Sequence, residues 1–174
     1  MVIAAWHNSR VATVSPDGST VSFIAGTGGR DFGGDGGPAS DAVLDLPCAV
    51  RVDEDDNIYL SDMANQRVRR VDTAGVIDTV AGTGDHGFNG DGDLLDTSFA
   101  SPALQRAEPA FKMDYVGGVL YVADTHNGRI RTLDLDTGAV TTVAGRGETP
   151  IGSDNGTACT DGCGYGGDGG PAVD

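Results

Sequence analysis

The chain has 174 residues with 28 glycines, and its 26 acidic residues against 11 Lys and Arg give a formal net charge of −15. Such an acidic chain repels phosphate backbones and anionic lipids, so we expect neither nucleic-acid binding nor membrane-surface binding. No apolar run approaches the ~20 residues of a membrane-spanning helix, and membrane insertion is therefore not expected.

An internal repeat organises the sequence. The marker Asn-x-Arg-(Val/Ile) occurs at 8–11, 65–68 and 127–130, and each copy is followed by a β-branched run that ends in Ala-Gly. A third marker, an aromatic residue two positions before Gly-Asp-Gly, begins at Phe32, Phe88 and Tyr165. Three markers in a fixed order indicate a repeat architecture.

Each repeat predicts short β-strands. The second copy carries four runs rich in Val, Ile or Tyr, at 48–53, 57–62, 67–72 and 76–81. Asp, Asn and Gly turn residues bound them. In the third run we expect Val68 and Val71 to face inward, around an exposed arginine-rich edge. Repeated four-stranded antiparallel units favour a β-propeller over a sandwich, since a sandwich would not repeat its sequence.

The blades follow in chain order. We expect about three strands of a first blade at 2–25, a second blade at 48–82, a third at 110–145 and a trailing linker at 146–174. Leu94 and Leu95, in the linker after the second blade, are expected to form a short helical turn.

These residues carry a family resemblance. The segment 47–84 resembles the NHL repeat, as does 121–131, and the Ala-Gly-Thr-Gly…Gly-Asp-Gly-Gly-Pro-Ala linker resembles that of bacterial surface proteins and of the NHL propeller of teneurins. The resemblance implies an all-β fold, a partial β-propeller of four-stranded antiparallel NHL-type blades. Whole NHL propellers close with about five or six blades. We therefore interpret residues 1–174 as an incomplete propeller, a fragment of a larger protein.

The recurring Asp-x-x-Asn-x-Arg turn is the main candidate for a repeated site. We predict a structural role, because Asp can accept backbone N–H groups in a turn and Arg can reach a neighbouring carboxylate or carbonyl. The first copy has Ala5 in place of the Asp. The turn residues are Asp62, Asn65, Arg67, Asp124, Asn127 and Arg129.

The Gly-rich linkers and the acidic segment 53–57 also carry residues that could bind a ligand, but a structural role is favoured for both. The linker glycines could cradle an anion and the linker carboxylate could bind calcium, but their repetition favours a structural role, with Phe32, Phe88 and Tyr165 as plugs between blades. Residues 53–57 read Asp-Glu-Asp-Asp-Asn, the opening of an EF-hand loop, but the later Gly and Glu ligands are missing. We expect a tight acidic turn there.

Metal and catalytic sites are not expected. His7, His86 and His126 should share one face, yet Ala64 interrupts the series, and zinc needs at least three converging ligands. No nucleophile, phosphate-binding loop or paired catalytic carboxylates stand out. We therefore expect no catalytic residue, no metal and no cofactor.

The three cysteines bear on the cellular compartment. Cys159 and Cys163 lie in an insertion and could close a small disulfide, while Cys48 should be a free, buried thiol. Residues 155–157 fit the N-glycosylation sequon. Both signals favour an extracellular or cell-surface protein.

The function expected from these features is recognition. We expect a non-catalytic binding or scaffold module of a larger exported or surface protein. One propeller face would present the Asp/Gly-rich linkers and the Asn-x-Arg turns to a protein or glycan ligand. The rest of the propeller, or other domains, would be further partners. The alternative is part of a metal-dependent propeller hydrolase or lyase related to lactonases, although none of their metal ligands can be matched. A structural spacer without a ligand is a third possibility.

Overall fold

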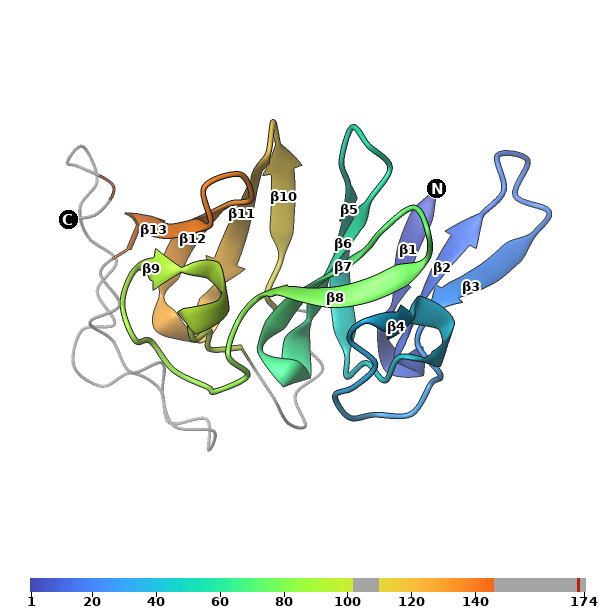
Figure 1. Ribbon diagram of the computed structural model, residues 1–174, viewed down its shortest axis with the longest axis horizontal. Helices are drawn as coiled ribbons and strands as arrows, with labels where there is room; N and C mark the ends of the chain where they lie inside the picture. Colours follow the sequence, from blue (N-terminus) through green and yellow to red (C-terminus); the bar gives the residue numbers. More distant parts are fainter. Residues whose placement is uncertain (102–109, 146–171, 173–174) are drawn as a thin grey trace.

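The computed structural model describes residues 1–101, 110–145 and 172. Within these residues the chain forms three antiparallel sheets that lie side by side as blades (Figure 1). The only helical elements among them are short 3₁₀ turns. The expectation of an all-β partial propeller is confirmed. No helix in the described ranges is long and apolar enough to cross a membrane.

The second blade shows the complete unit. Its sheet order is β4-β8-β7-β6-β5, so the four consecutive strands gain a fifth, outer strand from the preceding linker. The 3₁₀ turn η3 (Met63–Asn65) joins its second and third strands. The strands are β4 (Gly37–Pro38), β5 (Pro47–Val52), β6 (Ile58–Asp62), β7 (Arg67–Val71) and β8 (Val76–Ala81).

The third blade repeats this order. Its outer strand, like β4, belongs to the linker that leads into it, and η5 (Thr125–Asn127) takes the place of η3. The expected helical turn of that linker is present as η4 (Leu94–Asp96). The strands are β9 (Gly92–Asp93), β10 (Met113–Val116), β11 (Val119–Asp124), β12 (Arg129–Asp134) and β13 (Ala139–Ala144).

The first blade has three strands, in the order β1-β2-β3. They correspond to the last three strands of a full blade, because η1 (Trp6–Asn8) follows β1 as η3 follows β6. The linker after it contains η2 (Ala39–Asp41). The strands are β1 (Val2–Ala5), β2 (Arg10–Val14) and β3 (Val21–Ala25).

A bulge recurs where the third and fourth strands of each blade pair. The register shifts between Val11 and Ala12, between Val68 and Arg69, and between Ile130 and Arg131. The extra residue lies on the fourth strand each time, at Ile24, Val80 and Val143, whereas the third strand keeps an unbroken register with the second. Val68 and Arg69 therefore lie on opposite faces of their sheet, and both are fully buried because both faces are covered.

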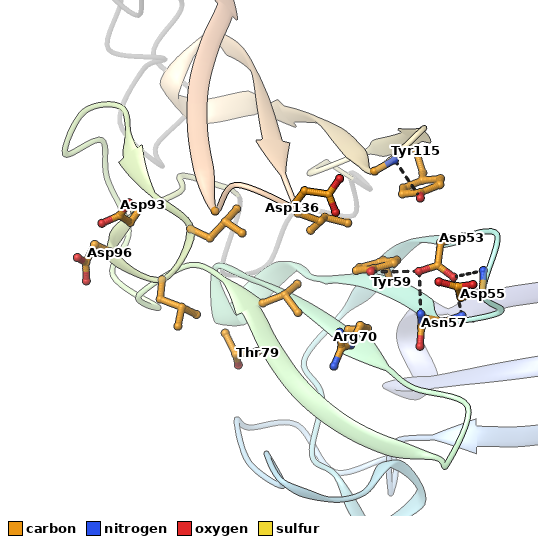
Figure 2. A pocket seen from close by; sticks show the side chains of 16 residues that line it. Asp53, Asp55, Asn57, Tyr59, Arg70, Thr79, Asp93, Asp96, Tyr115 and Asp136 are labelled. Carbon is orange, nitrogen blue, oxygen red and sulfur yellow. Dashed lines mark hydrogen bonds between the residues drawn. The ribbon is translucent and has the colours of Figure 1, made fainter.

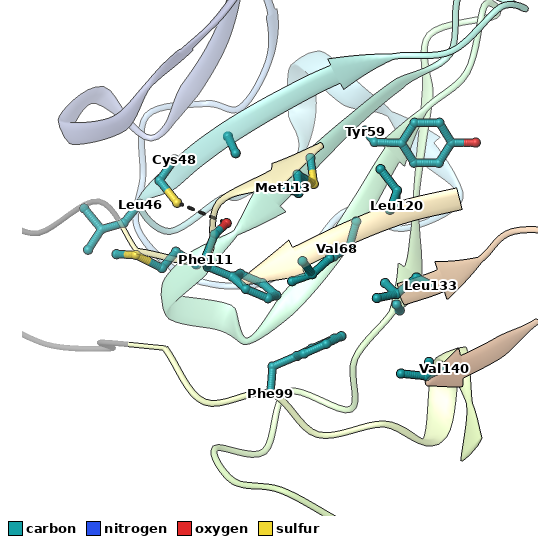
Figure 3. Close-up of a cluster of buried hydrophobic side chains, with 14 residues drawn as sticks. Leu46, Cys48, Tyr59, Val68, Phe99, Phe111, Met113, Leu120, Leu133 and Val140 are labelled. Atoms are coloured by element: carbon teal, nitrogen blue, oxygen red, sulfur yellow. Dashed lines mark hydrogen bonds between the residues drawn. The ribbon is translucent and has the colours of Figure 1, made fainter. Parts of the chain in front are cut away.

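The cores lie between blades. One buried cluster joins the second and third blades, and Phe99 and Phe111 from the segment between these blades pack within it, with ring centroids 5.0 Å apart (Figure 3). A second cluster, which includes Val11, Leu44 and Ile77, joins the first and second blades. Each sheet therefore buries its apolar residues against its neighbour.

Candidate functional site

Asp62, at the end of β6, organises the turn of the second blade. Its side chain is fully buried. The carboxylate accepts hydrogen bonds from the Asp45 N–H at 2.7 Å, from Asn65 Nδ2 at 2.9 Å and from Arg69 Nη1 at 3.2 Å. One carboxylate thus ties together the end of the linker, the 3₁₀ turn and strand β7.

The same blade binds the incoming linker through side chains. Asn65 donates to the carbonyl of Asp31 at 2.9 Å, and Arg69 Nη2 donates to Asp35 Oδ1 at 2.6 Å. Thr79, on β8, donates to the other oxygen of Asp35 at 2.7 Å. The Asp of the Gly-Asp-Gly marker is therefore held by an arginine and a threonine of the blade that follows it. We call Asp62, Asn65, Arg69 and Thr79 the linker socket of the second blade.

The third blade has an equivalent socket. Asp124 is fully buried and accepts from the Ala100 N–H at 2.8 Å and from Asn127 Nδ2 at 2.8 Å. Arg131 Nη1 lies 3.4 Å from the same carboxylate. Asp91, the linker aspartate, accepts from Thr142 Oγ1 at 2.8 Å and lies 3.5 Å from Arg131. This socket consists of Asp124, Asn127, Arg131 and Thr142.

The first blade lacks most of the socket. Ala5 replaces the buried Asp, Ala12 replaces the buried Arg, and the strand registers place Phe23 where the other blades have Thr79 and Thr142. Phe23 is 53% exposed. The Asp, Arg and Thr of the socket are thus all replaced by apolar residues in the first blade. Their joint loss is expected if the three residues act together.

The Arg of the Asn-x-Arg marker has a different contact. Arg67 donates to the Asn65 carbonyl at 3.0 Å and to the Thr83 carbonyl at 2.6 Å, so it fastens the outgoing linker. Its guanidinium carbon lies 3.9 Å from the ring centroid of Phe32. In the third blade Arg129 donates to the Asn127 carbonyl at 2.9 Å and lies 3.6 Å from the Phe88 ring.

A cleft of about 750 Å³ lies between the second and third blades, and Thr79 is the one socket residue that also lines it (Figure 2). Carboxylates occupy both of its ends, with Asp93 and Asp96 at one end and Asp55 at the other. Asp136 lines it from the third blade, and Arg70 supplies a guanidinium from β7. Val80, Leu94, Leu95 and Leu135 add apolar side chains.

Two tyrosines form part of the cleft wall. Tyr59 and Tyr115 stack with ring centroids 6.0 Å apart and an interplanar angle of 9°. The Tyr59 hydroxyl donates to Asp53 at 3.2 Å and the Tyr115 hydroxyl donates to Glu54 at 2.6 Å. Burial, followed by the charge of Asp53, raises the pKa of Tyr59 to about 12. Both phenols therefore stay neutral and hydrogen-bonded at neutral pH.

Curated relatives of this chain are NHL-repeat proteins and a chloroplast protein. It is 32% identical over 148 residues to NHL repeat-containing protein 2 of Bos taurus and 31% identical over 145 residues to the Homo sapiens protein, matches that cover 80% and 79% of the chain. It is 37% identical over 109 residues, 62% of the chain, to SUPPRESSOR OF QUENCHING 1, chloroplastic, of Arabidopsis thaliana. The chain spans only 10% to 19% of the length of these relatives. No family model matches it.

Solved structures share the fold. A Bacteroides thetaiotaomicron protein of unknown function aligns with a TM-score of 0.57 at 23% identity, over 80% of this chain and 30% of that one. An auxiliary nutrient binding protein of the same organism aligns with a TM-score of 0.52 at 18% identity, over 80% of this chain and 33% of that one. Together these comparisons support an NHL-repeat β-propeller family.

The NHL-type blades place two important arginines differently from the sequence prediction. The edge of the third strand was expected to be exposed, but Arg69 is fully buried, as is Arg131. Each arginine keeps an unbroken register with the second strand of its blade, so it alternates normally to the sheet face opposite that of the preceding Val or Ile. It is buried because the incoming linker covers that face, which a prediction of one solvent-exposed face does not anticipate. A sequence signal existed: Arg-(Val/Ile)-Arg occurs in the two copies that have the turn Asp, whereas the copy with Ala5 has Ala12.

The aromatic residues of the linkers do not plug the space between NHL-type blades. Phe32 and Phe88 are 38% and 41% exposed and lie over the guanidinium groups of the sockets. Cation–π contact explains an aromatic residue at this position better than burial does. Tyr165, the third member of the set, lies outside the described residues.

The histidines only partly converge. His86 and His126 meet edge to face with ring centroids 5.7 Å apart, whereas the His7 ring lies against Trp6, with 4.3 Å between their ring centroids. In the described parts of the chain no group of three or more His, Cys, Asp or Glu is placed to hold a metal ion.

The acidic segment 53–57 forms the predicted tight turn. Asp53 accepts from the N–H groups of Asp55 at 3.0 Å and Asn57 at 2.8 Å. Partial burial opposes ionisation of Asp53, but the hydrogen bonds from Asn57 and Asp55 outweigh it and lower its pKa. This carboxylate is used by the turn itself and is not an open ligand.

Burial raises the pKa of Asp62 to about 6 from an ordinary value of 3.8, despite the opposing hydrogen bonds of Asn65 and the charge of Arg69. At pH values between 3.8 and about 6, the Asp62 carboxyl group is protonated in the folded state and ionised in the unfolded state. The stabilisation from this proton is therefore complete below about pH 4 and is lost as the pH rises through 6.

Asp62→Asn should remove this dependence. We expect the free energy of unfolding of the wild type, relative to the variant, to fall by about 2–3 kcal/mol between pH 4 and pH 7. Urea unfolding at several pH values measures the difference, and the carbon-13 shift of the Asp62 carboxyl should titrate near pH 6. A carboxyl midpoint below pH 4 would contradict the prediction.

Cys48 is a free, buried thiol, as the sequence predicted, and contacts Ser61 Oγ at 3.3 Å. Burial raises its pKa. We expect native alkylation of Cys48 at neutral pH to be at least about 100-fold slower than in urea, because the thiolate is scarce and covered. Peptide mass spectrometry reports the rate, and equal rates in both conditions would refute burial. Cys159 and Cys163, the predicted disulfide pair, lie outside the described residues.

Proposed function

We propose that this NHL-type propeller segment is a non-catalytic binding module of a larger exported or surface protein, and that it recognises a protein or glycan ligand. The rest of a propeller, or other domains of the larger protein, would be its structural partners. The likeness of the linkers to those of bacterial surface proteins and teneurins supports the surface location. No observation in the described residues favours the hydrolase or lyase alternative.

The inter-blade cleft is the observation that carries the proposal. The face first expected to meet a ligand presents the Asn-x-Arg turns and linkers, but Asp62 and Asp124 there are fully buried and bonded within the fold. The cleft instead offers exposed carboxylates, a guanidinium and apolar side chains on strands and turns of two blades. Pockets that combine apolar surface with a few polar groups are typical ligand sites.

A ligand screen tests the proposal. The full chain should be applied to a glycan array and to a displayed random-peptide library, and each hit should be titrated with the isotope-labelled protein. Saturable binding with NMR shift changes confined to Thr79, Leu95 and Asp136 is the expected result. Absence of any saturable ligand would overturn the proposal and favour a structural spacer.

A further inference from the structure

We propose that the cleft between the second and third blades binds an extended basic peptide segment, in which Lys or Arg side chains flank an apolar side chain. This inference rests on the proposed binding function and names the partner class for that cleft.

Charge is the first argument. Asp55, Asp93, Asp96 and Asp136 all line the cleft and are all exposed, whereas Arg70 is the single basic residue among its lining residues. None of the four belongs to a linker socket. Complementary charge sets specificity and association rate at an interface, so this cleft favours a cationic partner and rejects an acidic one.

The apolar floor is the second argument. Val80, Leu94 and Leu135 are partly buried and pack on the core that joins the two blades, so they form a fixed surface. Leu95 beside them is 60% exposed. Burial of one apolar side chain of the partner against this floor would stabilise the complex through the hydrophobic effect, which the exposed carboxylates cannot supply.

The layout of the cleft selects an extended segment. Asp93 and Asp96 lie at one end of the cleft, Asp55 lies at the other and Asp136 lies between them (Figure 2). Carboxylates therefore follow the length of the cleft, and an extended segment whose basic side chains flank an apolar one can meet several of them while it contacts the apolar lining. A cleft of about 750 Å³ is large enough for such a short segment.

Other ligand types fit less well. In the part of the chain that the structure describes, the carboxylates do not group as metal ligands. The two tyrosines stack on each other, Tyr59 is only 5% exposed, and their hydroxyls already donate to Asp53 and Glu54. Apart from the Arg70 guanidinium, the charged groups left open to a partner are carboxylates, and apolar side chains lie beside them.

The test uses a fluorescent peptide of alternating lysine and leucine, with a glutamate–leucine peptide as the charge-reversed probe. Fluorescence anisotropy gives Kd for the wild type and for a triple variant, Asp93→Asn, Asp96→Asn and Asp136→Asn. The matched control is Asp31→Asn, Asp41→Asn and Asp85→Asn, which removes the same charge from exposed positions outside the cleft. Leu95→Ser probes the apolar contact without changing charge.

We expect the lysine–leucine peptide to bind and the glutamate–leucine peptide not to bind. The cleft triple variant should raise Kd at least about fivefold, and the control should raise it by less than about twofold. Leu95→Ser should also weaken binding. Equal losses in the two triple variants, or no binding of the basic peptide, would overturn the inference. If a glycan or acidic peptide bound at the cleft instead, the inference would fail while the proposed function stood; if nothing bound, both would fail.

Discussion

Asp62→Ala should lower the free energy of unfolding at pH 7.5 by about 3 kcal/mol or more, because it removes the fully buried carboxylate partner of Arg69 and leaves the guanidinium with only the partly exposed Asp35. Both side chains of this pair are fully buried, with 3.2 Å between Arg69 Nη1 and Asp62 Oδ2. The substitution also removes the acceptor for the Asp45 N–H and for Asn65. Urea unfolding followed by circular dichroism measures the loss.

Two comparisons isolate the buried pair. Asp114→Ala breaks the ion pair with Arg51, which joins β10 of the third blade to β5 of the second. Because the Asp114 side chain is 70% exposed, this variant should leave stability nearly unchanged. The double variant Asp62→Leu with Arg69→Met removes both charges and should lose less than Asp62→Ala alone. If Asp62→Ala lost no more than Asp114→Ala, the socket would not be a stabilising feature.

Gly82→Ala should lower the free energy of unfolding by about 3 kcal/mol or more, because it combines backbone strain with a steric clash. Gly82 has φ of +102°, and a Cβ there would overlap the carbonyl oxygen of Gln66 and lie 3.0 Å from the Arg67 Cα. Its N–H donates to the Leu94 carbonyl at 2.9 Å, so the chain at Gly82 cannot move away without breaking its hydrogen bond to the η4 turn of the linker.

Gly75→Ala is the matched control for Gly82→Ala. Gly75 has φ of +80°, but a Cβ at this position would meet no atom within 4 Å. This variant should cost only the strain of a left-handed residue, about 1–2 kcal/mol. Thermal and urea unfolding of both variants give the comparison. Equal losses would show that the close approach of Gly82 to Gln66 has no energetic weight.

The sequence alone predicted the parts of the fold that depend on local pattern. Short β-branched runs between Gly, Asn and Asp turns define the strands, and the recurring Asn-x-Arg and Ala-Gly markers define the blades. The acidic turn at 53–57 and the helical turn at Leu94 follow from side chains within a few residues of each other. The burial of Cys48 could also be anticipated, because it is a small apolar residue at the start of the first predicted strand of its blade.

Tertiary structure alone decided where the sockets and the cleft lie. An alternating pattern with one exposed face assigned Arg69 to the surface, but the linker that precedes the second blade covers that face and buries the arginine. Asp35 meets Thr79, 44 residues later, because the linker crosses to the outer strand of the following blade. The cleft is formed by turns and linkers of two blades, and its charge and depth arise only when these blades pack together. Local propensity encodes the strands of a blade, whereas the contacts between blades depend on residues far apart in the chain that only the packed fold brings together.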